Sequence, residues 1–295
     1  MAIQDNGIYF YFMKYYINYS DEAFKKQQDF ALLMAHKRGK FDNIIGYSRE
    51  DIDKTFYEKN NTILDQSKGG GYWLWKPYFI NKKLEEINEG DYLFYSDSGA
   101  FLLKNIDILI KELEKYNQDI MGFELPLIES QWTKKELFIN MDCNKNKYFN
   151  SNHILASFIL IKKSDFSINF FKEYLFFSCN EINITDKFDT NIVQDGDFID
   201  HRHDQSIFSL LYKKYKLRPF KDPSQLGKYP SGYSGSSEDS LEINELHMLD
   251  NGRKFRQLEY KENYNMILFH NRKSNPKLSF IKYKIKEILY IFFKK

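Results

Sequence analysis

Short apolar runs alternate with segments of helical periodicity along the first 125 residues of the 295-residue chain, and this alternation constrains the fold more than any other feature. Short runs rich in aromatic and branched side chains predict strands, whereas longer segments with apolar residues three and four positions apart predict helices. Strands that alternate with helices predict an α/β fold, in which helices flank a mostly parallel, Rossmann-type central sheet. The predicted strands are 8–13, 41–47, 91–96 and 119–124, and the predicted helices are 21–38, 48–64, 72–87 and 105–116.

The second half of the chain is less regular. Residues 154–162 and 266–269 predict strands, and 165–179 and 204–215 predict helices. Residues 223–240 are rich in Gly and Ser and predict either a mobile functional loop over a site or a surface insertion. Because no internal repeat or linker divides the chain, we expect a single composite domain over 1–275, followed by a C-terminal helix at 276–295.

The composition excludes several classes of protein. Lys plus Arg total 43 and Asp plus Glu total 41, and this balance excludes a protein built mainly to coat nucleic acid. No apolar stretch approaches the ~20 residues that span a bilayer. The N-terminal residues lack the basic region and cleavage site of a signal peptide, and Cys143 and Cys179 form no disulfide-framework pattern. A cytoplasmic protein is therefore expected.

Aromatic residues make up 18% of the chain, with Phe 27, Tyr 22 and Trp 3. Such an excess serves either a sugar-binding cleft or a core filled with rings instead of aliphatic side chains. Most rings fall in predicted strands and in the Phe-rich helix 165–179, so we expect them in the core. The rings that we expect near a cleft are Tyr72, Trp73, Trp75, Trp132 and Tyr233.

An acidic turn follows the predicted strand 91–96. Asp97 stands just beyond the strand, and the small residues Ser98 and Gly99 follow it. Ligands of open α/β sheets bind at the carboxyl ends of the strands, so Asp97 is placed to approach a metal or a diphosphate. Asp-Ser-Gly is also a common capping turn, and the motif alone leaves both interpretations open.

A glycine-rich segment upstream carries more specific chemistry. Three glycines, 69–71, precede Tyr-Trp-Leu-Trp-Lys-Pro at 72–77, where a helix is predicted to begin. The glycines give backbone freedom, the indoles give flat stacking faces and Lys76 gives a cation, and these groups can hold a nucleobase or sugar and a phosphate. At least one of the two indoles is expected instead to pack the helix against the sheet.

These blocks resemble a group of bacterial and viral glycosyltransferases of polysaccharide and lipopolysaccharide synthesis. The resemblance runs from about 41 to 211 and includes Phe-Glu-Leu-Pro at 123–126, Trp-Thr-Lys at 132–134, Ala-Ser-Phe-Ile at 156–159 and His-Arg-His-Asp-Gln-Ser at 201–206. It implies the GT-A fold, with a nucleotide-sugar-binding half at about 1–125 and an acceptor-binding half at 126–275. It also implies donor binding by a set of residues in the two blocks described above, namely Tyr72, Trp75, Lys76, Asp97, Ser98 and Gly99.

The same resemblance implies a divalent metal at Asp97, because enzymes of this fold hold one with an Asp-x-Asp motif after a central strand. This chain departs from the motif, since Tyr95 and Gly99 stand two residues to either side of Asp97. A late histidine is a further ligand in many such enzymes, and His270 matches it, although His270 is equally open to interpretation as a surface turn residue. The expected cofactor is Mn²⁺ or Mg²⁺, with Mn²⁺ the better match to an imidazole.

The pair Asp204-Gln205 resembles the Asp-Gln pair at a helix start in the related lipopolysaccharide galactosyltransferase and glycogenin group, where the pair contacts the transferred sugar. An acid at a helix N-terminus is stabilised as the anion and remains an acceptor for sugar hydroxyls. Asp204 is therefore expected to bind the donor sugar or to act as the base on the acceptor hydroxyl, the alternative being a plain helix cap. Glu124 and Glu129 are further candidates for that base, and the candidates for phosphate contact are Arg202, Arg272 and Lys273.

The end of the chain is basic and aromatic. Such a helix either lies in an anionic membrane interface or packs on the core as an ordinary terminal helix. The first interpretation predicts peripheral association with the inner face of the cytoplasmic membrane and a lipid-linked glycan acceptor. The apolar residues near one face of the predicted helix, between flanking lysines, are Leu278, Ile281, Ile285, Ile288, Leu289 and Phe292.

The sequence therefore predicts a glycosyltransferase of the hexosyltransferase type, which moves a sugar from a nucleotide sugar, with a UDP-sugar as the first candidate. The expected acceptor is a glycan in the synthesis of capsule, lipopolysaccharide or a similar surface polysaccharide. Two alternatives stay open on the same scaffold: a non-catalytic protein that binds carbohydrate or nucleotide, and a nucleotide-sugar hydrolase. Nucleic acid is not an expected partner.

Overall fold

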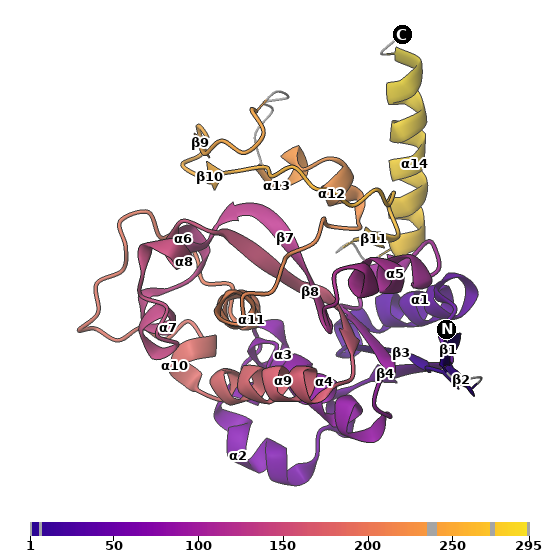
Figure 1. The fold of residues 1–295 in the computed structure, drawn as a ribbon. Coiled ribbons are helices and arrows are strands. Elements are labelled where there is room, and N and C mark those ends of the chain that lie inside the picture. Colours follow the sequence, from indigo (N-terminus) through magenta and orange to yellow (C-terminus); the bar gives the residue numbers. More distant parts are fainter. Residues whose placement is uncertain (1, 6–7, 235–240, 272–274, 294–295) are drawn as a thin grey trace.

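The computed structural model describes residues 2–5, 8–234, 241–271 and 275–293. A seven-stranded sheet in the order β4-β3-β5-β8-β7-β10-β9 forms its centre (Figure 1). β3 pairs in parallel with β4 and β5, and all other neighbours pair antiparallel, so β8 and β10 run opposite to the other five strands. The predicted α/β class, with a sheet of mostly parallel direction between helices, is confirmed. The strands of the sheet are β3 (Lys14–Tyr19), β4 (Asn43–Tyr47), β5 (Tyr92–Ser96), β7 (Ile120–Ile128), β8 (Asn152–Lys162), β9 (His247–Met248) and β10 (Lys254–Phe255).

Two small sheets lie outside the central one: β1 (Ala2–Asp5) pairs with β2 (Ile8–Tyr11), and β6 (Ala100–Leu102) pairs with β11 (Leu268–His270). The prediction that 8–13 forms the first central strand is therefore wrong, because that strand is β3, which begins at Lys14. A lysine is an unexpected start for a buried strand. Here the Lys14 ammonium is paired with Asp107 at 2.9 Å, which compensates its burial.

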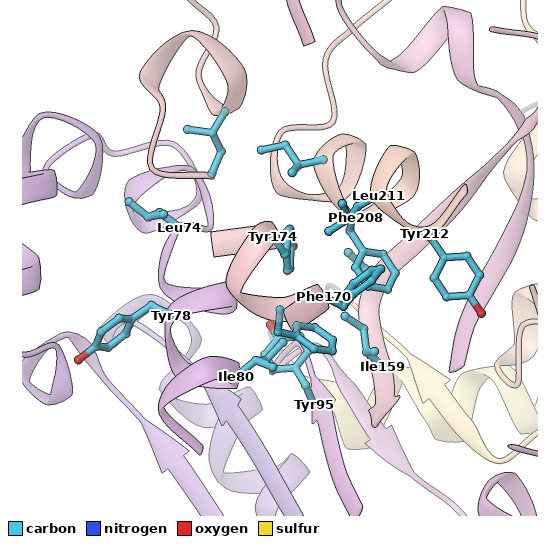
Figure 2. Packing of buried hydrophobic residues seen from close by; sticks show 14 of the residues in the cluster. Leu74, Tyr78, Ile80, Tyr95, Ile159, Phe170, Tyr174, Phe208, Leu211 and Tyr212 are labelled. Carbon is cyan, nitrogen blue, oxygen red and sulfur yellow. The ribbon is translucent and has the colours of Figure 1, made fainter. Parts of the chain in front are cut away.

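Helices cover both faces of the central sheet (Figure 1). On one face, α4, α9 and α11 pack apolar side chains against the sheet and form the cluster of Figure 2. On the other face, α5 contributes to a second cluster. Alternation along β5 separates the clusters, since Leu93 and Tyr95 belong to the first and Tyr92 and Phe94 to the second. The helices that pack on the sheet or begin near its edge are α1 (Lys25–Met34), α2 (Lys54–Leu64), α3 (Gly69–Tyr72), α4 (Trp75–Glu86), α5 (Asp107–Lys115), α9 (Asp165–Ser178) and α11 (Asp204–Lys214).

Rings fill much of both clusters, as expected from the aromatic excess. Tyr95 of β5, Phe170 and Tyr174 of α9, and Phe208 of α11 all have relative exposures of 1% or less, and Figure 2 shows them together. Edge-to-face contacts join several of these rings, including Phe170 with Phe208 at 5.7 Å. The aromatic composition of the chain is thus mainly a property of its core.

Several predicted boundaries are confirmed. Ser48 and Asp51 form the expected capping box, which here opens a short 3-10 turn, Arg49–Asp51, ahead of α2. The remaining elements are the turns Glu22–Phe24 and Ala35–Gly39 beside α1, and the short helices α6 (Glu129–Trp132), α7 (Lys135–Asn140), α8 (Asn146–Phe149) and α10 (Glu181–Ile184).

The region predicted as a loop, 223–240, contains two short helices instead, α12 (Gln225–Lys228) and α13 (Ser231–Ser234), and its last six residues lie outside the described part of the chain. The predicted terminal helix is present as α14 (Pro276–Phe293), which projects from the body of the protein (Figure 1). Phe280, near its start, contacts Phe101 and Phe269. Among the described residues, no helix combines the length and apolarity needed to cross a membrane.

Candidate active site

A cavity of about 460 Å³ opens where the parallel strands β3 and β5 end. Its wall is built from segments far apart in the sequence: Tyr19–Asp21 after β3, Ser67–Gly70 before α4, Asp97–Gly99 after β5, and Asp200–Gln205 at the start of α11. The carboxyl ends of parallel strands are the usual place for ligands in α/β sheets. The cavity is therefore the candidate active site.

Most of the residues predicted for the site meet in this cavity. The structure places nine of them in its lining: Trp75, Lys76, Asp97, Ser98, Gly99, Arg202, Asp204, Gln205 and His270. Tyr72 is not in the lining, and its hydroxyl donates a hydrogen bond to Asp186 at 3.0 Å. Arg272 and Lys273 lie outside the described residues.

The two further candidates for a general base lie elsewhere. Glu124 lines a second, smaller cavity instead of this one. Glu129 is fully buried, where it accepts hydrogen bonds from Thr133 and Ser209 and pairs with Lys213. A carboxylate engaged in this way inside the core is a structural group. Only the carboxylates of the main cavity are placed to act on a ligand there.

Lys76 is the centre of the site. Its ammonium lies 2.6 Å from Asp204 Oδ2 and 3.3 Å from Asp97 Oδ1, and its side chain is only 3% exposed. Asp204 is 5% exposed, whereas Asp97, at 25%, faces the open cavity. The Tyr95 and Tyr174 hydroxyls donate hydrogen bonds to Asp97 and Asp204, at 2.5 and 3.2 Å. A buried cation is thus held between two carboxylates, each supported by a tyrosine.

This pairing keeps Lys76 charged. Burial by itself lowers the pKa of Lys76, but the two carboxylates outweigh it and the pKa is raised above its ordinary value. Burial raises the pKa of Asp204, and the attraction of Lys76 opposes that rise. Burial and the nearby carboxylates raise the pKa values of Tyr95 and Tyr174 well above 10, so both hydroxyls stay protonated and donate.

The glycine turn positions Lys76. Gly69, Gly70 and Gly71 all have positive φ, and a Cβ on Gly71 would lie 2.7 Å from the Leu64 backbone. Only glycine fits there, because a side chain would both strain the backbone and collide with Leu64. The turn brings the chain into α4, and Lys76 lies in the first turn of that helix.

Both indoles of the block pack against the protein. Trp75 stacks on Tyr19 with ring centroids 4.0 Å apart, and its N–H donates to the Gly69 carbonyl at 3.0 Å. Trp73 stacks on His203, with ring centroids 5.3 Å apart, and a Cβ on Gly69 would lie 2.5 Å from the Trp73 indole. The expectation that at least one indole has a packing role is confirmed for Trp75, whose exposure is 5%.

The segment before α11 is strained. His203 caps that helix with φ 54° and ψ −122°, a conformation that L-residues rarely adopt. His203 Nδ1 lies 2.8 Å from the Ile184 carbonyl, and His201 Nε2 lies 2.8 Å from the Asn183 carbonyl. Burial lowers the pKa of His203 to about 4, so the ring is neutral near pH 7. These contacts impose the strain and fix the position of Asp204.

Arg202 lies beside the two histidines. Its guanidinium stacks over the Trp132 ring at 4.2 Å, and Arg202 also belongs to the cavity lining. Stacking on an indole holds a guanidinium in a fixed position. Trp132 is 2% exposed and therefore supports the cavity wall from behind.

The donor set for a metal is small. Asp97 and His270 line the same cavity, but no group of three His, Cys, Asp or Glu residues that could hold a metal occurs within the described ranges. Mg²⁺ and related ions are often bound by one or two protein ligands together with substrate phosphates. Asp97 and His270 would suffice only for a metal that completes its coordination with a bound diphosphate.

Sequence reasoning missed the contribution of the first central strand. Tyr19, Ser20 and Asp21 line the cavity because β3, beside β5, ends at the same edge of the sheet. Ser20 is 4% exposed, and its hydroxyl has no hydrogen-bond partner within the described part of the chain. A buried unsatisfied hydroxyl in a cavity wall marks a place where a ligand completes the hydrogen bonding. The available signal was the aromatic run that continues past Lys14 to Tyr19. Because the predicted strand was placed at 8–13, the end of β3 at Tyr19 was not recognised.

Comparisons with known proteins give overall likeness only. No model of a protein family matches the chain, and no curated protein matches it. Among solved structures, mouse xyloside xylosyltransferase 1 is 10% identical with a TM-score of 0.47, over 88% of this chain and 98% of that one. GlyE, a glycosyltransferase of Streptococcus pneumoniae, is 13% identical with a TM-score of 0.43, over 92% of this chain and 59% of that one. Galactosyltransferase LgtC, solved with donor and acceptor sugar analogues, is 12% identical with a TM-score of 0.41, over 88% and 87%.

Proposed function

We propose that this protein is a glycosyltransferase that moves a sugar from a nucleotide sugar, first a UDP-sugar, to a glycan acceptor of surface polysaccharide synthesis. The observation that carries the proposal is the buried Asp97–Lys76–Asp204 group at the carboxyl ends of β3 and β5. Its three residues come from three sequence blocks that resemble glycosyltransferases, and they meet in one cavity. The Ser20 hydroxyl in the same wall, unsatisfied among the described residues, supports the proposal that the cavity takes a polar ligand.

The chemistry of transfer assigns a task to each group. The acceptor oxygen bonds to the anomeric carbon as the bond from that carbon to the nucleoside diphosphate breaks, and the hydroxyl proton passes to a base. Stabilisation of the departing diphosphate is the largest demand on such a site. Lys76 and Arg202 supply positive charge for it. Asp204 Oδ1 makes no hydrogen bond to the described residues, so it is available to the sugar hydroxyls or to the attacking hydroxyl.

A divalent metal, Mn²⁺ first, belongs to this proposal. Asp97 and His270 would hold it together with the donor diphosphate, and the metal would add positive charge where the leaving group develops negative charge. An imidazole ligand favours Mn²⁺ over Mg²⁺. Gln225 supports His270, because its side-chain amide donates to the His270 carbonyl at 2.6 Å and accepts from the His270 N–H at 2.9 Å.

Nucleotide sugars should raise the melting temperature of the protein, and UDP-sugars should raise it most. A ligand that binds only the folded state stabilises it by about 2.7 kcal/mol at a hundred times its dissociation constant. The measurement is a thermal-shift screen of UDP-, GDP- and CMP-linked sugars with and without Mn²⁺, followed by assays of sugar release and transfer. Release of free sugar that continues unchanged when acceptors are added would identify a hydrolase. Binding of a nucleotide sugar without turnover would identify a binding protein. Indifference to every nucleotide sugar would contradict the proposal.

The terminal helix α14 supports the proposal that the protein associates peripherally with an anionic membrane. Four aliphatic side chains along α14, Leu278, Ile281, Ile285 and Ile288, are between 45% and 52% exposed. The exposed residues Lys277, Lys282 and Lys284 accompany this apolar stripe. An apolar stripe beside cations suits the interface of a bilayer with anionic lipids.

Substituting the stripe should release the protein from anionic vesicles. The double variant Ile281→Glu, Ile285→Glu places two carboxylates where apolar contact with lipid is expected, so binding should fall by more than about tenfold. Flotation with vesicles of phosphatidylglycerol and phosphatidylcholine measures it, with Val193→Glu, at another exposed aliphatic site, as the control. If the double variant floats with vesicles as wild type does, α14 has no role in membrane binding. The same conclusion follows if the substitutions change the oligomeric state of the protein but not its vesicle binding.

A further inference from the structure

A second cavity of about 260 Å³ lies between β7 and the segments around α12 and Tyr260. It shares no lining residue with the main cavity. Its wall contains three carboxylates, Glu124 of β7, Asp222 and the exposed Glu259, and two tyrosines, Tyr233 and Tyr260. The transfer chemistry proposed above uses none of these groups.

Glu124 has unused hydrogen-bonding capacity. One carboxylate oxygen, Oε2, accepts from the Tyr260 hydroxyl at 3.0 Å, and Oε1 has no hydrogen-bond partner among the described residues. Burial raises the pKa of Glu124, although Lys213 and Arg256 pull it down. Oε1 is therefore open to a hydroxyl donor of a ligand, which would complete the hydrogen bonding of the carboxylate.

Asp222 contrasts with Glu124, since both of its oxygens are occupied. It accepts from the Ser224 N–H and from the Tyr233 hydroxyl, each at 2.7 Å. Asp222 therefore holds the Tyr233 ring in the wall of the cavity and leaves Glu124 as the acceptor open to a ligand. Burial also raises the pKa of Asp222.

The rest of the wall is mixed in character. Pro126, Leu226 and Leu258 give apolar surface, and the two lysines, Lys221 and Lys228, offset two of the three carboxylates in formal charge. Apolar and aromatic surface beside a few polar groups is the usual composition of a small-molecule site. A wall with one net negative formal charge and an open carboxylate acceptor disfavours an anion and suits a neutral ligand that presents hydroxyl donors. Sugars combine such hydroxyls with apolar C–H faces.

The short helix α12 is connected to both cavities. Gln225, the first residue of α12, holds the backbone of His270 in the main cavity, and the next residues of the same helix, Leu226–Lys228, line the second. A helix rises about 1.5 Å per residue, so four residues span only about 6 Å along its axis. A glycan that extends past His270 along this helix would approach the second cavity.

We propose that the second cavity binds a neutral sugar residue of the glycan acceptor, away from the reacting hydroxyl, with Glu124 Oε1 accepting from a sugar hydroxyl. This assignment rests on the proposed transfer function, and it gives Glu124 a binding role in place of the predicted role of a base. The cavity thereby contributes to the choice of acceptor. The reaction itself stays at Asp97, Lys76 and Asp204.

The test measures disaccharide and UDP binding separately on the full chain. Saturation-transfer NMR with lactose, maltose and cellobiose reports the second cavity, and the thermal shift with UDP and Mn²⁺ reports the main one. Glu124→Leu removes the acceptor, and Tyr260→Phe is a second variant that keeps the ring and the Glu124 carboxylate. The matched control is Glu89→Gln at an exposed glutamate.

At least one disaccharide should bind wild type and the control, and Glu124→Leu should weaken that binding roughly fivefold to thirtyfold while leaving the UDP shift in place. Tyr260→Phe removes the hydroxyl that holds Glu124, so it should weaken the binding of the same disaccharide. Wild type that binds none of the three, or a Glu124→Leu variant that folds and binds as wild type does, would overturn the assignment. Sugar binding that depends on Glu124, in a protein that binds none of the nucleotide sugars of the screen, would support this site and contradict the proposed transferase.

Discussion

Asp97→Ala should abolish sugar transfer while leaving the fold intact. Asp97 follows β5, where its carboxylate accepts from Tyr95 and contacts Lys76, and its side chain is a quarter exposed. The variant loses the only predicted carboxylate ligand for the metal and frees Lys76 from one of its two partners. Loss of a group that stabilises charge in a transition state costs about a hundredfold to a thousandfold in kcat. We expect a loss at the upper end of that range, with a melting temperature near that of wild type.

Release of the nucleoside diphosphate gives the rate, and thermal unfolding by circular dichroism gives the stability. Asp65→Ala is the matched control, because Asp65 is an exposed aspartate that pairs with Arg49 on the surface. Asp97→Asn separates charge from packing, since it keeps the size of the side chain and removes the anion. Transfer at the wild-type rate by the alanine variant would remove Asp97 from the site.

The architecture was largely predictable, because local pattern determines most of it. Strands such as β5 are continuous apolar runs, and Ser48 with Asp51 marks a helix entrance by its own hydrogen bonds. The first central strand was not predictable, because the pairing of Lys14 with Asp107 joins positions far apart in the sequence. The two helices of 223–240 were also missed, since each spans a single turn, which is too short for a periodic pattern.

The residues of the site were predictable, but the contacts between them were not. Motif blocks identified Lys76, Asp97 and Asp204, and the structure brings them into one cavity. Nothing in their spacing showed that the lysine would lie between the two acids instead of facing outward. Glu124 shows the opposite case: it was predicted as a candidate base because it lies in a motif block, and the structure places it in the lining of another cavity. Which end and face of the sheet a side chain reaches depends on strand order and register.

Lys76→Met should be the most damaging single substitution in the site, for both stability and activity. Methionine keeps much of the apolar stem and removes the ammonium, so Asp204 is left buried beside a neutral group. Removing one partner of a buried ion pair costs about 3–5 kcal/mol of the free energy of unfolding. Transfer should be lost as well, because the cation proposed to receive the departing diphosphate is absent.

The stability defect of Lys76→Met should depend on pH with a definite sign. Without the lysine, burial and the charge of Asp97 raise the pKa of Asp204 above its unfolded value with less opposition than in wild type. A carboxyl group with a raised folded pKa favours the folded state below its unfolded pKa, and that contribution is lost as pH rises through the folded pKa. The gap between wild type and variant should therefore be small near about pH 4 and widen toward neutral pH, where Asp204 must ionise without its partner.

Urea unfolding across that pH range measures the gap, and the double variant Lys76→Met, Asp204→Asn is the control. Replacing the stranded carboxylate with a neutral amide should recover stability at neutral pH and flatten the pH dependence, yet leave transfer undetectable. A gap that stays constant with pH in both variants would mean that Lys76 acts through packing alone. In that case the charge that stabilises the leaving diphosphate would have to come from Arg202 and the metal, because the other cation at the base of the cavity would have no electrostatic role.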